Sequence, residues 1–218
     1  MSSLIERYLG LKNNYRNYDT KDAIKRMQAF RGAVRDLKQK GYPVGIELLG
    51  SISFGLVEPY SDADLVLIHY CDLHKDSGSC PESCPNLIFE QTEITKALKR
   101  RLKDAMFNIE FLDNLNLKYV EHVLETENPV TNECAYRLLY YRTMGRPVNR
   151  PLFIKYCDTL EKDEESLSGF LEWSSEALAA YLKTISHRHS FNKYNERIIN
   201  RGLELPPELK EELTQYLE

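Results

Sequence analysis

Residues 48–68 read LLGSISFGLVEPYSDADLVLI, and this stretch decides the fold of the N-terminal half. An apolar segment ends at Gly50 and Ser51, and a second apolar segment begins with Asp62 and Asp64. The residues between them include glycine, proline and serine, which favour turns. The stretch therefore predicts two strands joined by a short connection, with two acids at the start of the second strand.

The two acids lie one residue apart. Side chains alternate between the faces of a strand, so Asp62 and Asp64 share one face while Ala63 and Leu65 point into the core. Adjacent carboxylates repel each other, and partial burial raises that cost. A divalent cation removes the repulsion, and carboxylate oxygens suit Mg²⁺ or Mn²⁺. Taken alone, the pair also fits a solvated strand start with a Ser-Asp turn.

Gly50 and Ser51 favour the metal interpretation. Glycine lets the backbone approach a phosphate closely, and backbone N–H groups with a serine hydroxyl can hold its oxygens. The order is an apolar residue, Gly-Ser, ten residues, then Asp62, Ala63 and Asp64. This pattern resembles the signature of the DNA polymerase β-like nucleotidyltransferase superfamily, of the small type. The resemblance covers residues 44–113.

The resemblance implies an enzyme that transfers a nucleoside monophosphate from a triphosphate, such as ATP, to an acceptor hydroxyl and releases pyrophosphate. It implies that Asp62 and Asp64 bind Mg²⁺ or Mn²⁺, and that Gly50 and Ser51 hold the triphosphate. It also implies a third acid on a neighbouring strand, as general base and further metal ligand. The acceptor is left open between a small molecule, a protein and an RNA end.

The segment FNIEFLD, residues 107–113, reads as a third strand and offers two candidates for that acid. Alternation places Glu110 opposite the apolar side chains, on the face expected to carry the site. The same alternation places Asp113 on the apolar face, at the strand end. Alternation therefore favours Glu110, and Asp113 remains the alternative.

Helical spacing of apolar residues predicts helices over 20–40 and 90–106, around these strands. Beyond residue 117 the strand signal fades, and the same spacing predicts helices over 117–127, 131–143, 150–162, 166–186 and 206–217. We therefore predict an α+β chain in two domains. A nucleotidyltransferase domain with a small mixed sheet and flanking helices occupies residues 1–116, and an all-helical domain occupies residues 117–218.

The composition limits the alternatives. The 218 residues carry a net charge of −4, which leans away from a processive polymerase. We expect no membrane span and no signal peptide, and hence a cytoplasmic protein. One alternative is a catalytically silent module that binds nucleotide or a partner, for example a toxin–antitoxin component. Another is a helical interaction module, with the sheet as its scaffold.

Two further clusters have open interpretations. The residues that could bind zinc within one short stretch are His69, Cys71, His74, Cys80 and Cys84. Their spacing matches no established zinc module, so a loop with reduced thiols is the alternative. Basic residues at 96–103 and 187–201 could contact nucleic acid or nucleotide, or could form solvated faces.

Overall fold

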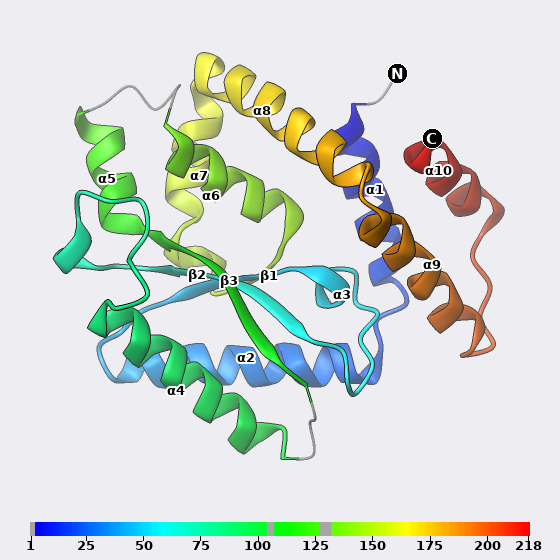
Figure 1. The fold of residues 1–218 in the computed structure, drawn as a ribbon, viewed down its shortest axis with the longest axis horizontal. Coiled ribbons are helices and arrows are strands. Elements are labelled where there is room, and N and C mark those ends of the chain that lie inside the picture. Colours follow the sequence, from blue (N-terminus) through cyan, green and yellow to red (C-terminus); the bar gives the residue numbers. More distant parts are fainter. Residues whose placement is uncertain (1–2, 104–106, 127–131) are drawn as a thin grey trace.

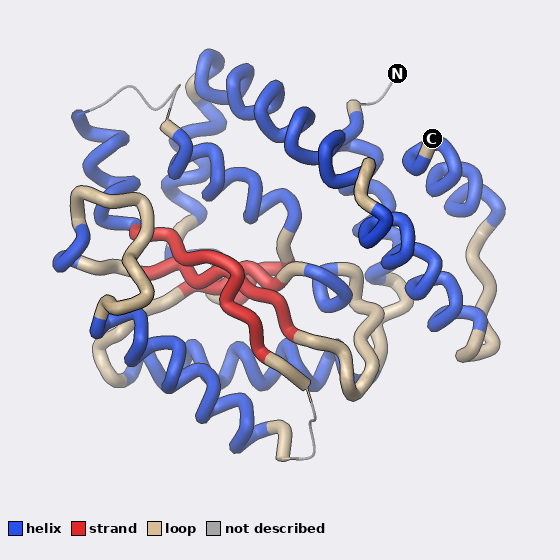
Figure 2. Tube along the Cα trace, viewed as in Figure 1, coloured by secondary structure: helices blue, strands red, loops and turns tan. Residues whose placement is uncertain are grey.

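The computed structural model describes residues 3–103, 107–126 and 132–218, and these form a four-stranded mixed sheet with helices on both faces (Figures 1 and 2). The strands lie in the order β3-β2-β1-β4, with β1 antiparallel to β2 and β4, and β2 parallel to β3. Their bounds are β1 Gly45–Leu48, β2 Ala63–His69, β3 Ile109–Asn116 and β4 Arg146–Val148.

One face of the sheet is covered by α2 (Lys21–Gln39) and α4 (Pro85–Arg101), which confirms the two helices predicted there. Residues 104–106 of the second prediction lie outside the described residues. The Thr20 hydroxyl caps α2 by accepting from the Ala23 N–H. The apolar side of α2 and the inner residues of β2, Leu65 among them, form one core.

The opposite face is covered by helices from the second half of the chain. These are α5 (Leu117–Thr126), α6 (Glu133–Met144), α7 (Ile154–Lys162) and α8 (Glu164–Leu182). Residues 127 and 131 of the predicted helices lie outside the described part of the chain. Val66 and Ile68 of β2 are buried against this second layer, so β2 is covered on both faces.

A third core lies at the end of the sheet where β2 begins. It joins α1 (Leu4–Arg16), α9 (Ile185–Ile199) and α10 (Pro207–Leu217) through aromatic rings. Phe54, from the connection between β1 and β2, enters this core and stacks on Tyr194 of α9 with a ring separation of 4.9 Å. The C-terminal helices therefore pack directly on the segment that carries the nucleotidyltransferase-like motif.

The described residues thus form an α+β fold, with additions that the sequence did not predict. These additions are α1, β4, α9, the four-residue helix α3 (Gly50–Ser53) and the short 3₁₀ turns η1 (Asp72–His74) and η3 (Arg150–Leu152). β3 extends to Asn116, three residues beyond the predicted strand. Among the described residues, no helix is both long and apolar enough to span a membrane.

Candidate active site

Asp64 is the second residue of β2 and is half-buried. Its backbone carbonyl accepts a hydrogen bond from the Leu49 N–H at 2.8 Å, which joins the end of β1 to the start of β2. Gly50 follows with φ +57°, and a Cβ there would lie 2.3 Å from Asp64 Oδ2. Only glycine combines this left-handed backbone with such a close approach. The Gly50 backbone therefore borders the Asp64 carboxylate directly.

Glu110 and Asp62 lie around the same carboxylate. Glu110 is the register partner of Asp64 on the parallel neighbour β3, so both side chains point to the same face. Asp62 lies just before β2, is exposed, and accepts a hydrogen bond from the Asn108 N–H at 3.3 Å. Burial raises the pKa of Asp64, and the negative charges of Glu110 and then Asp62 raise it further. The structure thus brings together the three acids singled out from the sequence.

The chemistry of these three side chains fits a divalent cation. They supply hard oxygen donors, and their mutual repulsion at Asp64 is what a bound cation would relieve. In the described residues the oxygens of the three acids do not all lie within 4.8 Å of one another. The acids are therefore neighbours, but they do not form a complete set of metal ligands by themselves. An open arrangement is typical of Mg²⁺ sites, which share their ligands with waters and substrate phosphates.

The prediction that Asp113 lies on the apolar face of β3 is wrong. The pairing of β2 with β3 shifts between Leu65 and Val66, where Leu112 is an extra residue, and Asp113 then pairs with Val66. The bulge turns Asp113 toward α6, where its carboxylate accepts from Arg137 Nε at 3.1 Å and from the Tyr141 hydroxyl at 2.7 Å. Asp113 is therefore engaged in an ion pair, whereas Glu110 is exposed beside Asp64.

Arginines that sequence reasoning did not single out hold the connection that contains Gly50 and Ser51. Arg16 Nε donates to the Ser53 carbonyl at 2.8 Å. Arg26 Nη2 donates to the Pro59 carbonyl at 2.8 Å, and Arg197 donates to the Leu56 carbonyl. These arginines come from α1, α2 and α9, so three separate helices fix the backbone beside Asp64. Ser51 is half-buried within this fixed segment.

A pocket of about 270 Å³ opens beside Gly50 and Asp64. Among the described residues that line it, none is lysine or arginine, and most are aromatic or aliphatic. The side chains that give the pocket its character are Phe54, Leu112, Tyr140, Tyr181, His187 and Tyr194. Apart from the Asp64 carboxylate, this largely apolar and partly aromatic wall suits a planar ring better than a polyphosphate.

Two polar side chains that line this pocket, His187 and Tyr181, are neutral at pH 7. Burial lowers the pKa of His187 to about 4, and its Nε2 lies 3.0 Å from the Tyr216 hydroxyl. Burial raises the pKa of Tyr181, and the charge of Asp64 adds to that rise. The 187–201 stretch thus forms α9, and its apolar side faces the pocket. The spacing of His187, Phe191 and Tyr194 could have indicated this amphipathic helix.

The basic run at 96–103 lies elsewhere. Most of it belongs to α4, which covers the face of the sheet opposite the acids. Arg100 and Arg101 pair with Asp36 of α2, and Lys96 pairs with Glu93. The basic run therefore forms ion pairs on a charged helix surface and does not line the pocket.

A buried carboxyl group that the sequence analysis did not single out lies on the same face of the sheet as Asp64. Glu47 of β1 is fully buried, and neither of its oxygens has a hydrogen-bond partner among the described residues. Burial raises its pKa to about 8, against the opposing effect of nearby cations, Arg150 and Lys12 among them. Burial lowers the pKa of Lys12 to about 7. Glu47 therefore holds its proton at neutral pH.

Comparison with known proteins identifies a family for this part of the chain. The family model of the nucleotidyltransferase domain matches residues 30–140, a range that contains Gly50, Asp62, Asp64 and Glu110. Searches of the curated proteins and of the solved structures give no significant match.

Proposed function

This chain belongs to the nucleotidyltransferase domain family and is a transferase of phosphorus-containing groups, and we propose that it transfers a nucleoside monophosphate to an acceptor hydroxyl with release of pyrophosphate. Its donor substrate is a nucleoside triphosphate. The observation that carries the proposal is the environment of Asp64. Glycine backbone borders its carboxylate on one side, two further acids raise its pKa, and a pocket opens beside it.

The reaction needs the triphosphate to be held while its α-phosphate is attacked. In the proposal, the backbone of Gly50 and Ser51 binds the phosphates, and the arginine contacts to the carbonyls of this connection keep that backbone fixed. Asp62, Asp64 and Glu110 would hold Mg²⁺, although Mn²⁺ also suits these ligands. When bound, such a cation neutralises negative charge on the phosphates as pyrophosphate departs.

Glu110 is the proposed general base. It is exposed beside Asp64, so its carboxylate can reach an acceptor hydroxyl that approaches from solvent. It takes the proton as the hydroxyl oxygen bonds to the α-phosphorus and the bond to pyrophosphate breaks. Asp113 is excluded from this role because its carboxylate is bound by Arg137 and Tyr141.

The aromatic pocket is proposed to bind the nucleobase. Apart from the Asp64 carboxylate, its wall offers ring faces and hydroxyl groups, and it borders the glycine beside which the phosphates would lie. The open side of the acids is then left for the acceptor. The presence of all three acids disfavours a catalytically silent module, which would be expected to have lost one of them.

The acceptor is identified by following label from each of the four α-³²P-labelled nucleoside triphosphates, with Mg²⁺ and a total cell extract. We expect label to enter one fraction among RNA, protein and small molecules. The control is Asp64→Asn, which removes the carboxylate but keeps the size of the side chain. Label that enters a fraction equally with wild type and Asp64→Asn comes from another enzyme in the extract. Absence of Asp64-dependent transfer with all four triphosphates would support a silent nucleotide-binding protein instead.

A further inference from the structure

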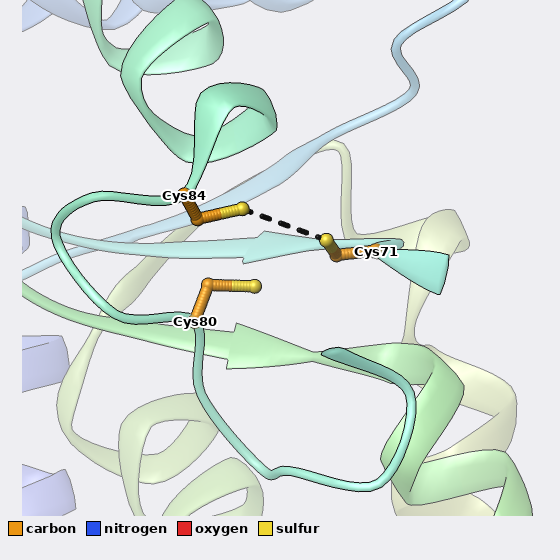
Figure 3. Close-up of side chains that lie close together, drawn as sticks. All are labelled: Cys71, Cys80 and Cys84. Carbon is orange, nitrogen blue, oxygen red and sulfur yellow. Dashed lines mark hydrogen bonds between the residues drawn. The ribbon is translucent and has the colours of Figure 1, made fainter. Parts of the chain in front are cut away.

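We propose that Cys71, Cys80 and Cys84 form a structural zinc site, separate from the acids. Their sulfur atoms all lie within 4.8 Å of one another, and the Cys71 and Cys84 sulfurs are 3.7 Å apart (Figure 3). Zinc–thiolate bonds of about 2.3 Å in a tetrahedron place two sulfurs roughly 3.8 Å apart. The Cys71–Cys84 separation therefore matches one edge of a tetrahedral zinc site, and the third sulfur lies close enough to complete a three-thiolate face.

Each cysteine has a backbone fixed by the fold. Asn116 of β3 accepts from the Cys71 N–H at 3.0 Å and donates to the Cys71 carbonyl at 2.9 Å. Asn114, two residues earlier on the same strand, makes the same pair of contacts with Cys80 at 2.6 and 3.1 Å. Cys84 is the N-cap residue of α4. Two asparagine side chains and a helix start thus hold the three thiols in place before any ion binds.

The surroundings suit metal thiolates. All three cysteines are buried, and the Asn86 side-chain amide lies 3.6 Å from the Cys71 sulfur as a donor. Hydrogen bonds from surrounding groups to a ligand sulfur are a common second layer in thiolate sites. Cys134 and Cys157 are equally buried, but they lie in a different core and have no place in this group of sulfurs. The clustering is therefore not a general property of the cysteines in this chain.

The histidines are not part of the proposed ligand set. His69 is buried with Nδ1 2.6 Å from Glu90, and its Nε2 has no hydrogen-bond partner among the described residues. When one ring nitrogen of a histidine binds a metal, the other typically donates a hydrogen bond to a carboxylate, as Nδ1 of His69 could to Glu90. However, the ring nitrogens of His69 do not lie within 4.8 Å of all three sulfurs. We therefore assign only the three thiolates as ligands, with a fourth position left to water or another donor.

The site has a structural role in this proposal. Cys71 follows β2, and Cys80 and Cys84 close the loop that leads from β2 to α4. Cys71 lies seven residues beyond Asp64, so about 23 Å of extended chain separates the sulfurs from the acids at 3.3 Å per residue. Zinc would thus fix the loop against the core. Each thiol loses its proton when zinc binds. Because zinc would bind the folded chain in preference to the unfolded chain, its binding would stabilise the folded state.

The test is the metal content of untagged full-length protein purified under reducing conditions after growth with zinc. We expect about one zinc per chain to survive dialysis against metal-free buffer. Cys80→Ser should lose most of that zinc, whereas the matched control Cys134→Ser, which removes a buried thiol outside the cluster, should keep it. Zinc-free wild-type protein, or equal loss in both variants, would overturn the proposal.

A second measurement needs no variant. Reduced, metal-free wild-type protein is titrated with Co²⁺, which reports sulfur ligands by intense thiolate-to-metal absorption. We expect that absorption to saturate at about one Co²⁺ per chain and to disappear when Zn²⁺ is added. A titration without thiolate absorption would contradict the site. A count of free thiols after denaturation gives a further check. Fewer than five titratable thiols in protein purified under reducing conditions would also contradict the site, because a disulfide between Cys71 and Cys84 would then occupy the cluster.

Discussion

Replacement of Asp113 by asparagine tests which acid of β3 serves the chemistry and which serves the fold. The Asp113 and Arg137 side chains are only 18% and 19% exposed to solvent. Loss of one partner from a buried ion pair costs about 3–5 kcal/mol, and the remaining solvent contact lowers that figure. We therefore expect Asp113→Asn to lower the free energy of unfolding by about 2–3 kcal/mol. In a chain of this size that corresponds to a fall of roughly 4–12 °C in Tm.

The matched variant is Glu110→Gln, an equally small change two positions away from the bulge at Leu112. It should reduce kcat by about 10²–10⁴-fold and leave Tm nearly unchanged, because Glu110 is exposed and acts as general base. Thermal unfolding and transfer rates, measured well below either Tm, separate the two effects. An Asp113→Asn protein that is stable but inactive, beside an active Glu110→Gln protein, would refute the assignment.

Three further predictions concern the same face of the sheet. Asp64→Asn should abolish transfer and remove the dependence of Tm on Mg²⁺, whereas transfer at more than a tenth of the wild-type rate would argue against a metal ligand. Gly50→Ala should impair transfer more than the control Gly41→Ala. Both glycines have positive φ, but only a Cβ at position 50 would strike Asp64. Equal activity in the two variants would mean that Gly50 is needed only for its backbone conformation. Burial raises the pKa of Glu47 from its ordinary 4.5 to about 8, so its contribution to stability is lost as pH rises across that window. Urea unfolding should therefore show Glu47→Gln gaining stability over wild type from pH 5 to pH 8, with Glu176→Gln unchanged as an exposed control, and a gap that does not vary with pH would be contrary to this account.

Local patterns predicted the central part of the fold. The turn residues between β1 and β2, the alternation around Ala63 and the apolar spacing of α2 each act over a few residues, so they are visible in the sequence. The same holds for the proximity of Asp64 and Glu110, because alternation within each of two neighbouring strands is enough to place both side chains on the same face of the sheet. The resemblance to nucleotidyltransferases supplied the reason to expect that these two strands are neighbours.

Other features depend on contacts between distant segments. The bulge at Leu112 is a property of the pairing of β3 with β2, and alternation within β3 alone gave the wrong face for Asp113. The three residues of β4 are too few to show a period, and they form a strand because β1 has a free edge there. The grouping of Cys80 with Cys71 depends on Asn114, thirty-four residues later in the chain.

The pocket lay beyond the sequence analysis for a similar reason. Its walls come from the connection after β1, from β2 and β3, and from α1, α6, α8 and α9, which no local pattern places together. The helical spacing of His187 and Phe191 was present in the sequence, but the many charged residues of that stretch made a surface connection equally acceptable. The packing of α9 on Phe54 and the hydrogen bond from Arg197 to the Leu56 carbonyl join this helix to the site.

The central claim is transfer from the α-phosphate, and the position of the label tests it most directly. The protein is incubated with Mg²⁺ and acceptor extract, in parallel with α-³²P-labelled and γ-³²P-labelled forms of the same triphosphate. The account predicts that the acceptor gains label only from the α-labelled form, that γ-label leaves as pyrophosphate, and that Asp64→Asn does neither. Acceptor labelled from the γ-position would indicate phosphoryl transfer and would contradict the account.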